Sequence, residues 1–112
     1  MSASVEVVRR HFSALADYDW PTLESSVSGG ANLRLVGVSN FNWTPTNLYR
    51  HVTQAWDLPV CDVQLTDEGE GVVRAKIHLG NALQAKDVEG EYCVAMGRID
   101  AISLTDAVPT KA

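Results

Sequence analysis

The sequence has few of the residues from which metal sites and disulfide frameworks are built. It holds only two cysteines in 112 residues, Cys61 and Cys93, and no CxxC, HExxH or Cys/His cluster. The spacings typical of zinc sites are therefore missing. We expect no metal and no cofactor, and we interpret both cysteines as buried, reduced thiols.

Long apolar runs and clustered basic residues are also missing. No segment approaches the ~20 apolar residues of a membrane span, and residues 1–5 lack a basic stretch that leads into an apolar run. Nine Lys and Arg stand against 14 Asp and Glu, which gives a net charge of -5 and argues against a nucleic-acid partner. The expectations are a cytoplasmic location, no membrane contact and no bound nucleic acid.

The composition that remains is that of a globular domain. Hydrophobic residues make up 46% of the chain and charged residues 21%, which argues against disorder. We predict a single domain over residues 1–112, because that length supports one core without disulfide or metal support.

Apolar periodicity predicts three helices in the first half of the chain. Val5, Val8, Phe12 and Leu15 recur at three- and four-residue spacing, which predicts a helix over residues 4–17. A second helix is expected from Asp19 as N-cap to residue 27, ended by residues 28–30, and a third begins at residues 44–45.

Strands dominate the rest. Residues 31–43 contain strand formers interrupted by turn residues, which predicts two short strands or a bent hairpin. Alternating patterns then predict strands over 60–66, 72–79, 88–95 and 98–105, with a tight turn at 96–97. Helices set apart from a run of antiparallel strands indicate an α+β fold.

This layout resembles the nuclear-transport-factor-2-like superfamily, which includes SnoaL-like polyketide cyclases, ketosteroid isomerases and limonene epoxide hydrolases. The resemblance rests on residues 7–15, on the acidic turn at 17–23 and on the segment 97–106, in which Gly-Arg-Ile leads into the last strand. It implies a cone in which a highly curved, mostly antiparallel sheet wraps around the helices and leaves an apolar pocket. It also implies a homodimer formed through the outer face of the sheet.

The resemblance implies two candidate catalytic residues. His11 falls where a ketosteroid isomerase has its oxyanion-donating tyrosine, and Asp100 would share the pocket-facing side of the last strand with Ile102 and Leu104. Histidine can exchange a proton near neutral pH, and a carboxylate among aliphatic side chains has a raised pKa. The alternatives are a histidine at the edge of the helix face and a rim aspartate paired to an arginine.

The catalytic residues of the known enzymes are not matched. The first-strand aspartate of the isomerases is replaced here by Leu35 and Val36, and Leu104 stands where the epoxide hydrolases have a last-strand carboxylate. Neither mechanism can therefore be assigned from the resemblance, because one fold supports many chemistries.

The aromatic residues favour a ligand pocket. Three Trp and three Tyr stand beside only two Phe, and rings with a polar tip can both line a cavity and bond a ligand. We predict Tyr18, Trp43, Trp56 and Tyr92 as ligand-binding residues.

Three functions remain open. The first is a protein that binds a small, largely apolar molecule. The second is an isomerase, cyclase or hydrolase that uses His11 with a pocket carboxylate. The third is a dimerisation domain without an open pocket. We also expect a homodimer. The last two strands have apolar residues at positions that alternate onto both faces of the sheet, whereas a monomer needs only one buried face.

Overall fold

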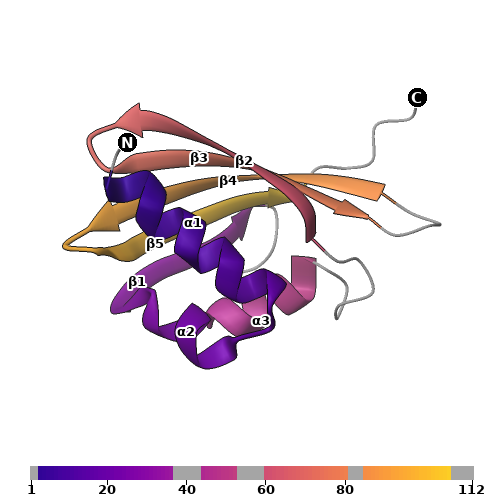
Figure 1. Cartoon of the computed structure of the whole chain (residues 1–112), viewed down its shortest axis with the longest axis horizontal. Helices are drawn as coiled ribbons and strands as arrows, with labels where there is room; N and C mark the ends of the chain where they lie inside the picture. The colour runs from indigo at the N-terminus through magenta and orange to yellow at the C-terminus, as the bar shows by residue number, and fades with distance from the viewer. Residues whose placement is uncertain (1–2, 37–43, 53–59, 81–84, 107–112) are drawn as a thin grey trace.

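The structure is a computed structural model that describes residues 3–36, 44–52, 60–80 and 85–106. Within these ranges, three helices and five strands follow one another (Figure 1). They are α1 (Ala3–Ala16), α2 (Trp20–Ser25), β1 (Val27–Val36), α3 (Pro45–Val52), β2 (Val60–Gly69), β3 (Val72–Gly80), β4 (Ala85–Ala95) and β5 (Arg98–Asp106). No helix in these ranges is long and apolar enough to cross a membrane.

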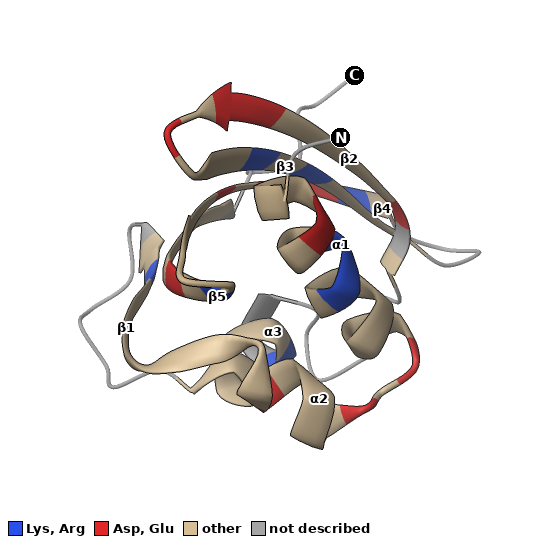
Figure 2. Cartoon of the chain, turned by 60° about the vertical axis from the view of Figure 1, so that its left-hand side comes forward, with Lys and Arg blue, Asp and Glu red and all other residues tan. Residues whose placement is uncertain are grey.

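The strands form one mixed sheet in the order β1-β5-β4-β3-β2. Each contact is antiparallel except that between β1 and β5, which is parallel. The sheet curls around α1, while α2 and α3 lie along the open side of the curl (Figure 2). The predicted α+β class and the predicted mostly antiparallel, curved sheet are confirmed.

The opening helix follows its apolar stripe. Val5, Val8, Phe12 and Leu15 are all buried against the concave face of the sheet, as their spacing predicted. The next helix is started by Asp19, whose carboxylate accepts hydrogen bonds from the backbone N–H and the hydroxyl of Thr22. Pro21 is tolerated there because a residue in the first turn of a helix has no intrahelical partner for its backbone N–H.

The end of the second helix differs from the prediction. Helix α2 stops at Ser25, and β1 starts at Val27 and runs through Gly29 and Gly30. Pairing with β5 decides this, since Val27 is the register partner of Ile99 and the Ile99 N–H donates to the Ser26 carbonyl. The two glycines therefore lie within a strand, where we predicted that they would end a helix.

The antiparallel strands confirm their predicted order. Strands β4 and β5 meet at the predicted two-residue turn, where Met96 (φ 53) and Gly97 (φ 78) are both left-handed. That combination is the geometry of a type I′ hairpin turn, whose twist matches that of the strands. The same geometry recurs at Glu70 and Gly71, between β2 and β3.

A bulge in β5 changes which side chains share a face. Cys93 pairs with Ala101 while its neighbour Val94 pairs with Ile99, so Asp100 is the extra residue. The bulge reverses the alternation, and Ile99 and Ile102 are both buried although they are three residues apart. The apolar residues of β4 and β5 therefore lie mainly on one face, and the premise of two apolar faces, from which we expected a homodimer, is wrong.

Candidate functional site

The most unusual group in the core is His11, a histidine with no exposed surface among aliphatic and aromatic side chains. Its Nδ1 lies 2.6 Å from Oγ of Ser26, at the end of α2. Its Nε2 lies 2.6 Å from the hydroxyl of Tyr49 on α3, which in turn lies 2.7 Å from the hydroxyl of Tyr92 on β4. One chain of polar groups thus joins α1, α2, α3 and the sheet.

The direction of these hydrogen bonds follows from the Ser26 end of the chain. The Ser26 hydroxyl donates to the carbonyl of Leu23 at 2.7 Å, so its oxygen accepts from Nδ1–H of His11. A neutral imidazole with its proton on Nδ1 has an acceptor at Nε2, which therefore takes the Tyr49 proton. The Tyr49 oxygen is then left to accept from Tyr92.

Burial keeps this chain uncharged. It lowers the pKa of His11 from 6.5 to about 3, so the imidazole is neutral near pH 7. Burial also raises the pKa of Tyr49 well above its usual range, with Tyr92 adding to the effect, and raises the pKa of Tyr92. A neutral, fully bonded histidine is not poised to exchange a proton near neutral pH.

Aromatic rings fill the core around the chain. Phe12 packs edge-on against Tyr92, with ring centroids 5.3 Å apart, and also contacts His11 and Tyr49. A glycine makes room for these rings. A Cβ at Gly90 would lie 2.6 Å from Cε1 of Tyr92, so only glycine lets that ring lean back over β4. Within the described residues, Phe12 lines a cavity and the other members of this aromatic cluster, His11, Tyr49 and Tyr92, line none.

The structure does not bring Asp100 to His11. The β5 bulge places Asp100 on the surface, where it accepts a hydrogen bond from Ser28 at 3.2 Å. The expectation that Asp100 shares a face with Ile102 and Leu104 is wrong, because it assumed an unbroken alternation. Neither Asp100 nor His11 lines any of the three cavities found among the described residues.

The four predicted ligand-binding rings are scattered. Tyr92 belongs to the buried chain, and Tyr18 is 50% exposed on the surface, where it contacts Trp20. Trp43 and Trp56 lie outside the described residues. Neither Tyr18 nor Tyr92 lines a cavity found among the described residues.

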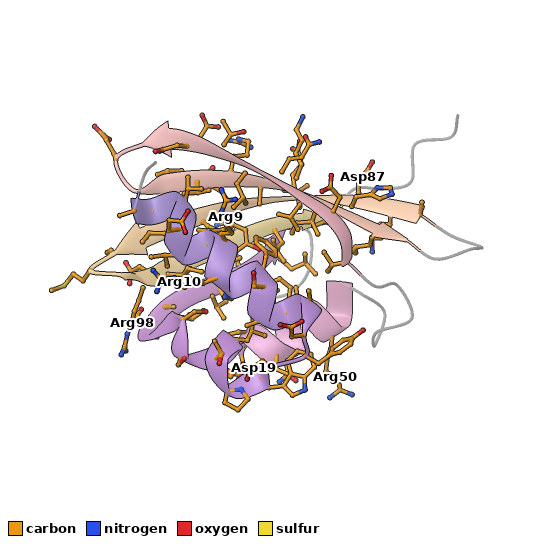
Figure 3. All side chains as sticks on the ribbon, in the orientation of Figure 1. Arg9, Arg10, Asp19, Arg50, Asp87 and Arg98 are labelled. Atoms are coloured by element: carbon orange, nitrogen blue, oxygen red, sulfur yellow. The ribbon has the colours of Figure 1, made fainter. Side chains whose placement is uncertain are left out.

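A groove suited to a small molecule lies instead between α1 and β2. Its volume is about 420 Å³, within the range of ligand pockets. Five of its eight lining residues are apolar, and the other three, Arg9, Ser13 and Asp62, are polar. The apolar members are Phe12, Ala16, Val60, Val63 and Leu65. Arg9 projects from α1 on the side of this groove and pairs with Glu6 at 3.6 Å (Figure 3).

Sequence reasoning missed this groove and one part of the buried chain. Phe12 was expected on the apolar stripe of a helix, and Val63 and Leu65 fall in the segment 60–66, which was expected only to be an alternating strand. Whether they leave a groove depends on how closely α1 packs on β2, which no pattern in either segment reports. Ser26 was missed too, since one serine among Ser25, Ser26 and Ser28 has no signal of its own.

The described residues show no metal centre, because no three His, Cys, Asp or Glu side chains within them are grouped to hold an ion. Cys93, one of the two cysteines, is a free, half-buried thiol whose pKa is raised, first of all by burial.

Comparison with known proteins relates this chain to others through structure alone. No protein-family model matches the sequence, and no curated protein matches it. A provisionally named ketosteroid isomerase from Kribbella flavida matches with a TM-score of 0.79 and 12% identity, over 98% of this chain and 82% of that one. A provisionally named polyketide cyclase from Xanthomonas campestris matches with a TM-score of 0.74 and 12% identity, over 94% of this chain and 90% of the other.

Proteins without an assigned activity match as well. An NTF2-like protein of unknown function from Cytophaga hutchinsonii has a TM-score of 0.70 at 12% identity, over 93% of this chain and 89% of that one. Identities this low show the fold and no activity. The chain has the curled α+β fold of the nuclear-transport-factor-2-like proteins, as the layout of its sequence predicted.

Proposed function

We propose that the protein binds a small, largely apolar molecule in the groove between α1 and β2. The observation that supports this is the groove itself, about 420 Å³ with five apolar side chains and three polar ones. Ligand sites have this composition, since apolar walls provide affinity and a few polar groups fix the orientation. Solved structures of the same fold include provisionally named cyclases and isomerases, whose names imply small organic substrates.

The polar groups define the ligand further. The Arg9 guanidinium and the Ser13 hydroxyl lie on the helix side of the groove, and the Asp62 carboxylate lies on the strand side. A molecule with an apolar body and a hydrogen-bonding acceptor at one end fits this distribution, because Arg9 can donate to a carbonyl or carboxylate. Trp43 and Trp56 remain proposed contacts, since they fall outside the described residues.

Catalysis by His11 and Asp100 lacks comparable support. His11 is neutral, fully buried and bonded at both ring nitrogens, and Asp100 is exposed on β5. General acid–base chemistry needs both groups within reach of one substrate. Binding without turnover is therefore the function that the geometry favours.

A ligand screen with a blocked groove tests the proposal. Unfolding temperatures would be measured for the full chain against a library of small apolar compounds. A compound present at 100 times its dissociation constant is expected to add about 2.7 kcal/mol to the stability. Ala16→Trp would fill the groove and abolish these shifts, whereas Ala3→Trp, at another exposed alanine of α1, would preserve them.

Two results would contradict the proposal. One is a screen in which no compound shifts the unfolding temperature. The other is a set of binders that stabilise the Ala16→Trp and Ala3→Trp variants equally, because that would place the ligand elsewhere. His11→Ala and Trp56→Ala extend the test, since loss of binding in Trp56→Ala alone would add that ring to the site.

A further inference from the structure

The outer face of the sheet holds a ladder of basic and acidic side chains. Strand β3 presents Arg74, Lys76 and His78, and β4 presents Glu91, Glu89 and Asp87 as their direct register partners. Figure 2 shows the basic positions of β3 in blue beside the red acidic segment of β2. Pairs in direct register on one face bring their Cβ atoms to about 5 Å, close enough for each pair to form an ion pair.

Only in the two outer pairs of this ladder are the two side chains in contact. Nδ1 of His78 lies 2.6 Å from Oδ1 of Asp87, and Arg74 lies 3.6 Å from Glu91 and 2.8 Å from Glu68. Lys76 and Glu89 are register partners too, yet within the described residues neither side chain forms an ion pair or a hydrogen bond. The middle pair of the ladder is therefore open.

A groove lies where the pair is open. Its volume is about 440 Å³, and it spans β2, β3 and β4. Six polar side chains and two apolar ones line it: Asp62, Gln64, Lys76, His78, Asp87 and Glu89, with Ile77 and Val88. Asp87 lies on β4, remote from the three helices (Figure 3). The polar side chains of this groove lie on the opposite face of the sheet from the buried His11 chain. Asp62, on the edge strand β2, also lines the α1–β2 groove.

The charges of this groove define a complementary ligand. Asp87 is already paired with His78, which leaves two carboxylates, Asp62 and Glu89, and one ammonium, Lys76. The complement is a molecule with one carboxylate and two cationic groups. We propose that this groove binds a free dibasic amino acid, with its carboxylate on Lys76 and its two cationic groups on Asp62 and Glu89. The Gln64 amide can bond either kind of group.

A second copy of the chain is the competing occupant. Two such faces could pair the Lys76 of one copy with the Glu89 of the other. The interface would then be centred on charged side chains, whereas the buried centres of homodimer interfaces are depleted of charge. A small charged ligand is therefore the occupant that the groove favours.

Titration of the full-length, ¹⁵N-labelled protein with L-lysine tests the inference. We expect shifts at the backbone amides around Asp62, Lys76 and Glu89, with a dissociation constant of about 1 to 10 mM, since each exposed ion pair contributes little. The shifts should fade at high salt, which screens exposed charges. Cadaverine lacks the carboxylate and 6-aminohexanoate lacks one cationic group, so each should bind at least threefold more weakly.

Matched variants locate the contacts. Lys76→Gln should weaken L-lysine binding about threefold without weakening cadaverine binding, and Glu89→Gln should weaken both. Arg74→Gln and Glu91→Gln alter the closed pair two residues away and should change neither. All four positions are on the surface, and an unchanged amide spectrum without ligand would confirm that each variant folds.

Three results would overturn the inference. They are the absence of localised shifts, equal shifts with L-lysine and sodium chloride, and a doubling of molecular mass that is lost in Lys76→Gln. The last result would identify a second copy of the chain as the occupant. Asp62 lines both grooves, so the two proposals are told apart by residues that line only one of them. Lys76 and Glu89 line only this groove, and Ala16, which the blocked-groove screen changes, lines only the groove between α1 and β2.

Discussion

The hydroxyl of Ser26 lies 2.6 Å from Nδ1 of His11, and this contact sets the state of the whole buried chain. Because the Ser26 proton is donated to the Leu23 carbonyl, the histidine must be the donor at Nδ1. Every later member of the chain then has one role, with Tyr49 donating to His11 and Tyr92 donating to Tyr49. All the polar atoms from α1 to β4 in this chain gain a partner, which a buried polar network requires.

The first prediction is that His11 is neutral and has its proton on Nδ1 at pH 7. The reason is the order of donors and acceptors that begins at Leu23. Two-bond and three-bond ¹⁵N–¹H correlations of the imidazole distinguish this tautomer from the Nε2–H form. In Ser26→Ala the Nδ1 acceptor is lost, and the Nδ1–H signal should shift or broaden. An Nε2–H tautomer in the unmodified protein would reverse the chain that we describe.

The second prediction is a loss of stability in mild acid. The pKa of His11 is about 3 in the folded protein and 6.5 when unperturbed, so below about pH 6.5 the unfolded chain binds a proton that the folded chain does not. The free energy of unfolding therefore falls as the pH falls, by about 2 kcal/mol between about pH 7 and pH 5 from this residue alone. The loss levels off below the folded pKa.

Chemical denaturation across this pH range measures that loss, with His11→Gln as the control. Glutamine does not titrate, so its stability curve should be flatter by the same amount. A direct NMR titration serves if the variant does not fold. Ring signals of His11 that titrate near pH 6 would show that the residue is not held neutral.

The third prediction concerns the two tyrosines. Tyr49→Phe removes the donor to Nε2 of His11 and leaves a buried acceptor without a partner, which costs about 1–3 kcal/mol. Tyr92→Phe removes only the last donor and should cost about 1 kcal/mol, the net contribution of an ordinary hydrogen bond. Urea denaturation of both variants and of the double variant gives the comparison. A larger loss in Tyr92→Phe would indicate that the Tyr49–Tyr92 bond runs the other way.

The sequence predicted the elements of the fold well where one local pattern decides. The apolar stripe of α1, the alternation of β3 and the turn at Met96 and Gly97 each involve residues close in the chain. Their outcomes follow from periodicity and turn geometry, which act over a few residues. The end of α2 was predicted wrongly because pairing between β1 and β5, which are far apart in the chain, outweighed the local preference of two glycines.

The candidate site was less predictable, because its parts meet only in the folded chain. His11 and Tyr49 are 38 positions apart, and the periodicity of either segment is the same whether or not they touch. The predicted position of Asp100 was wrong because β5 contains a single extra residue. This bulge shifts the alternation of the strand, so residues before it lie on the opposite face from the one predicted. A bulge leaves little trace in the sequence. The face of the sheet on which a carboxylate beside a bulge lies could therefore not be derived.

The fourth prediction concerns assembly. We expected a homodimer, and the two apolar faces that suggested it are absent from β4 and β5 as the structure describes them. The homodimer itself stays a prediction, tested by light scattering of the full chain during size-exclusion chromatography. A mass of twice 12.2 kDa that persists in Lys76→Gln is the expected result, and a mass of one chain at all concentrations would contradict it.

The fifth prediction isolates the glycine beneath Tyr92. A Cβ at Gly90 would lie 2.6 Å from Cε1 of Tyr92 and 2.7 Å from Cδ2 of Leu104, both within the packed core. Gly90→Ala should therefore destabilise the protein by about 1–3 kcal/mol, the usual cost of overpacking. It should also move the Tyr92 hydroxyl away from Tyr49, which the ring signals of both tyrosines would report.

Gly30→Ala is the matched control for that change. Gly30 also lies in a strand, but a Cβ there would meet nothing within 4 Å. The stability of the Gly30→Ala variant should therefore stay within about 0.5 kcal/mol of that of the unmodified protein. The difference between the two variants measures the space that Gly90 leaves for the ring, apart from the general effect of replacing a strand glycine. Equal stabilities would mean that Tyr92 can adopt another rotamer at little cost, and that the buried chain does not depend on this glycine.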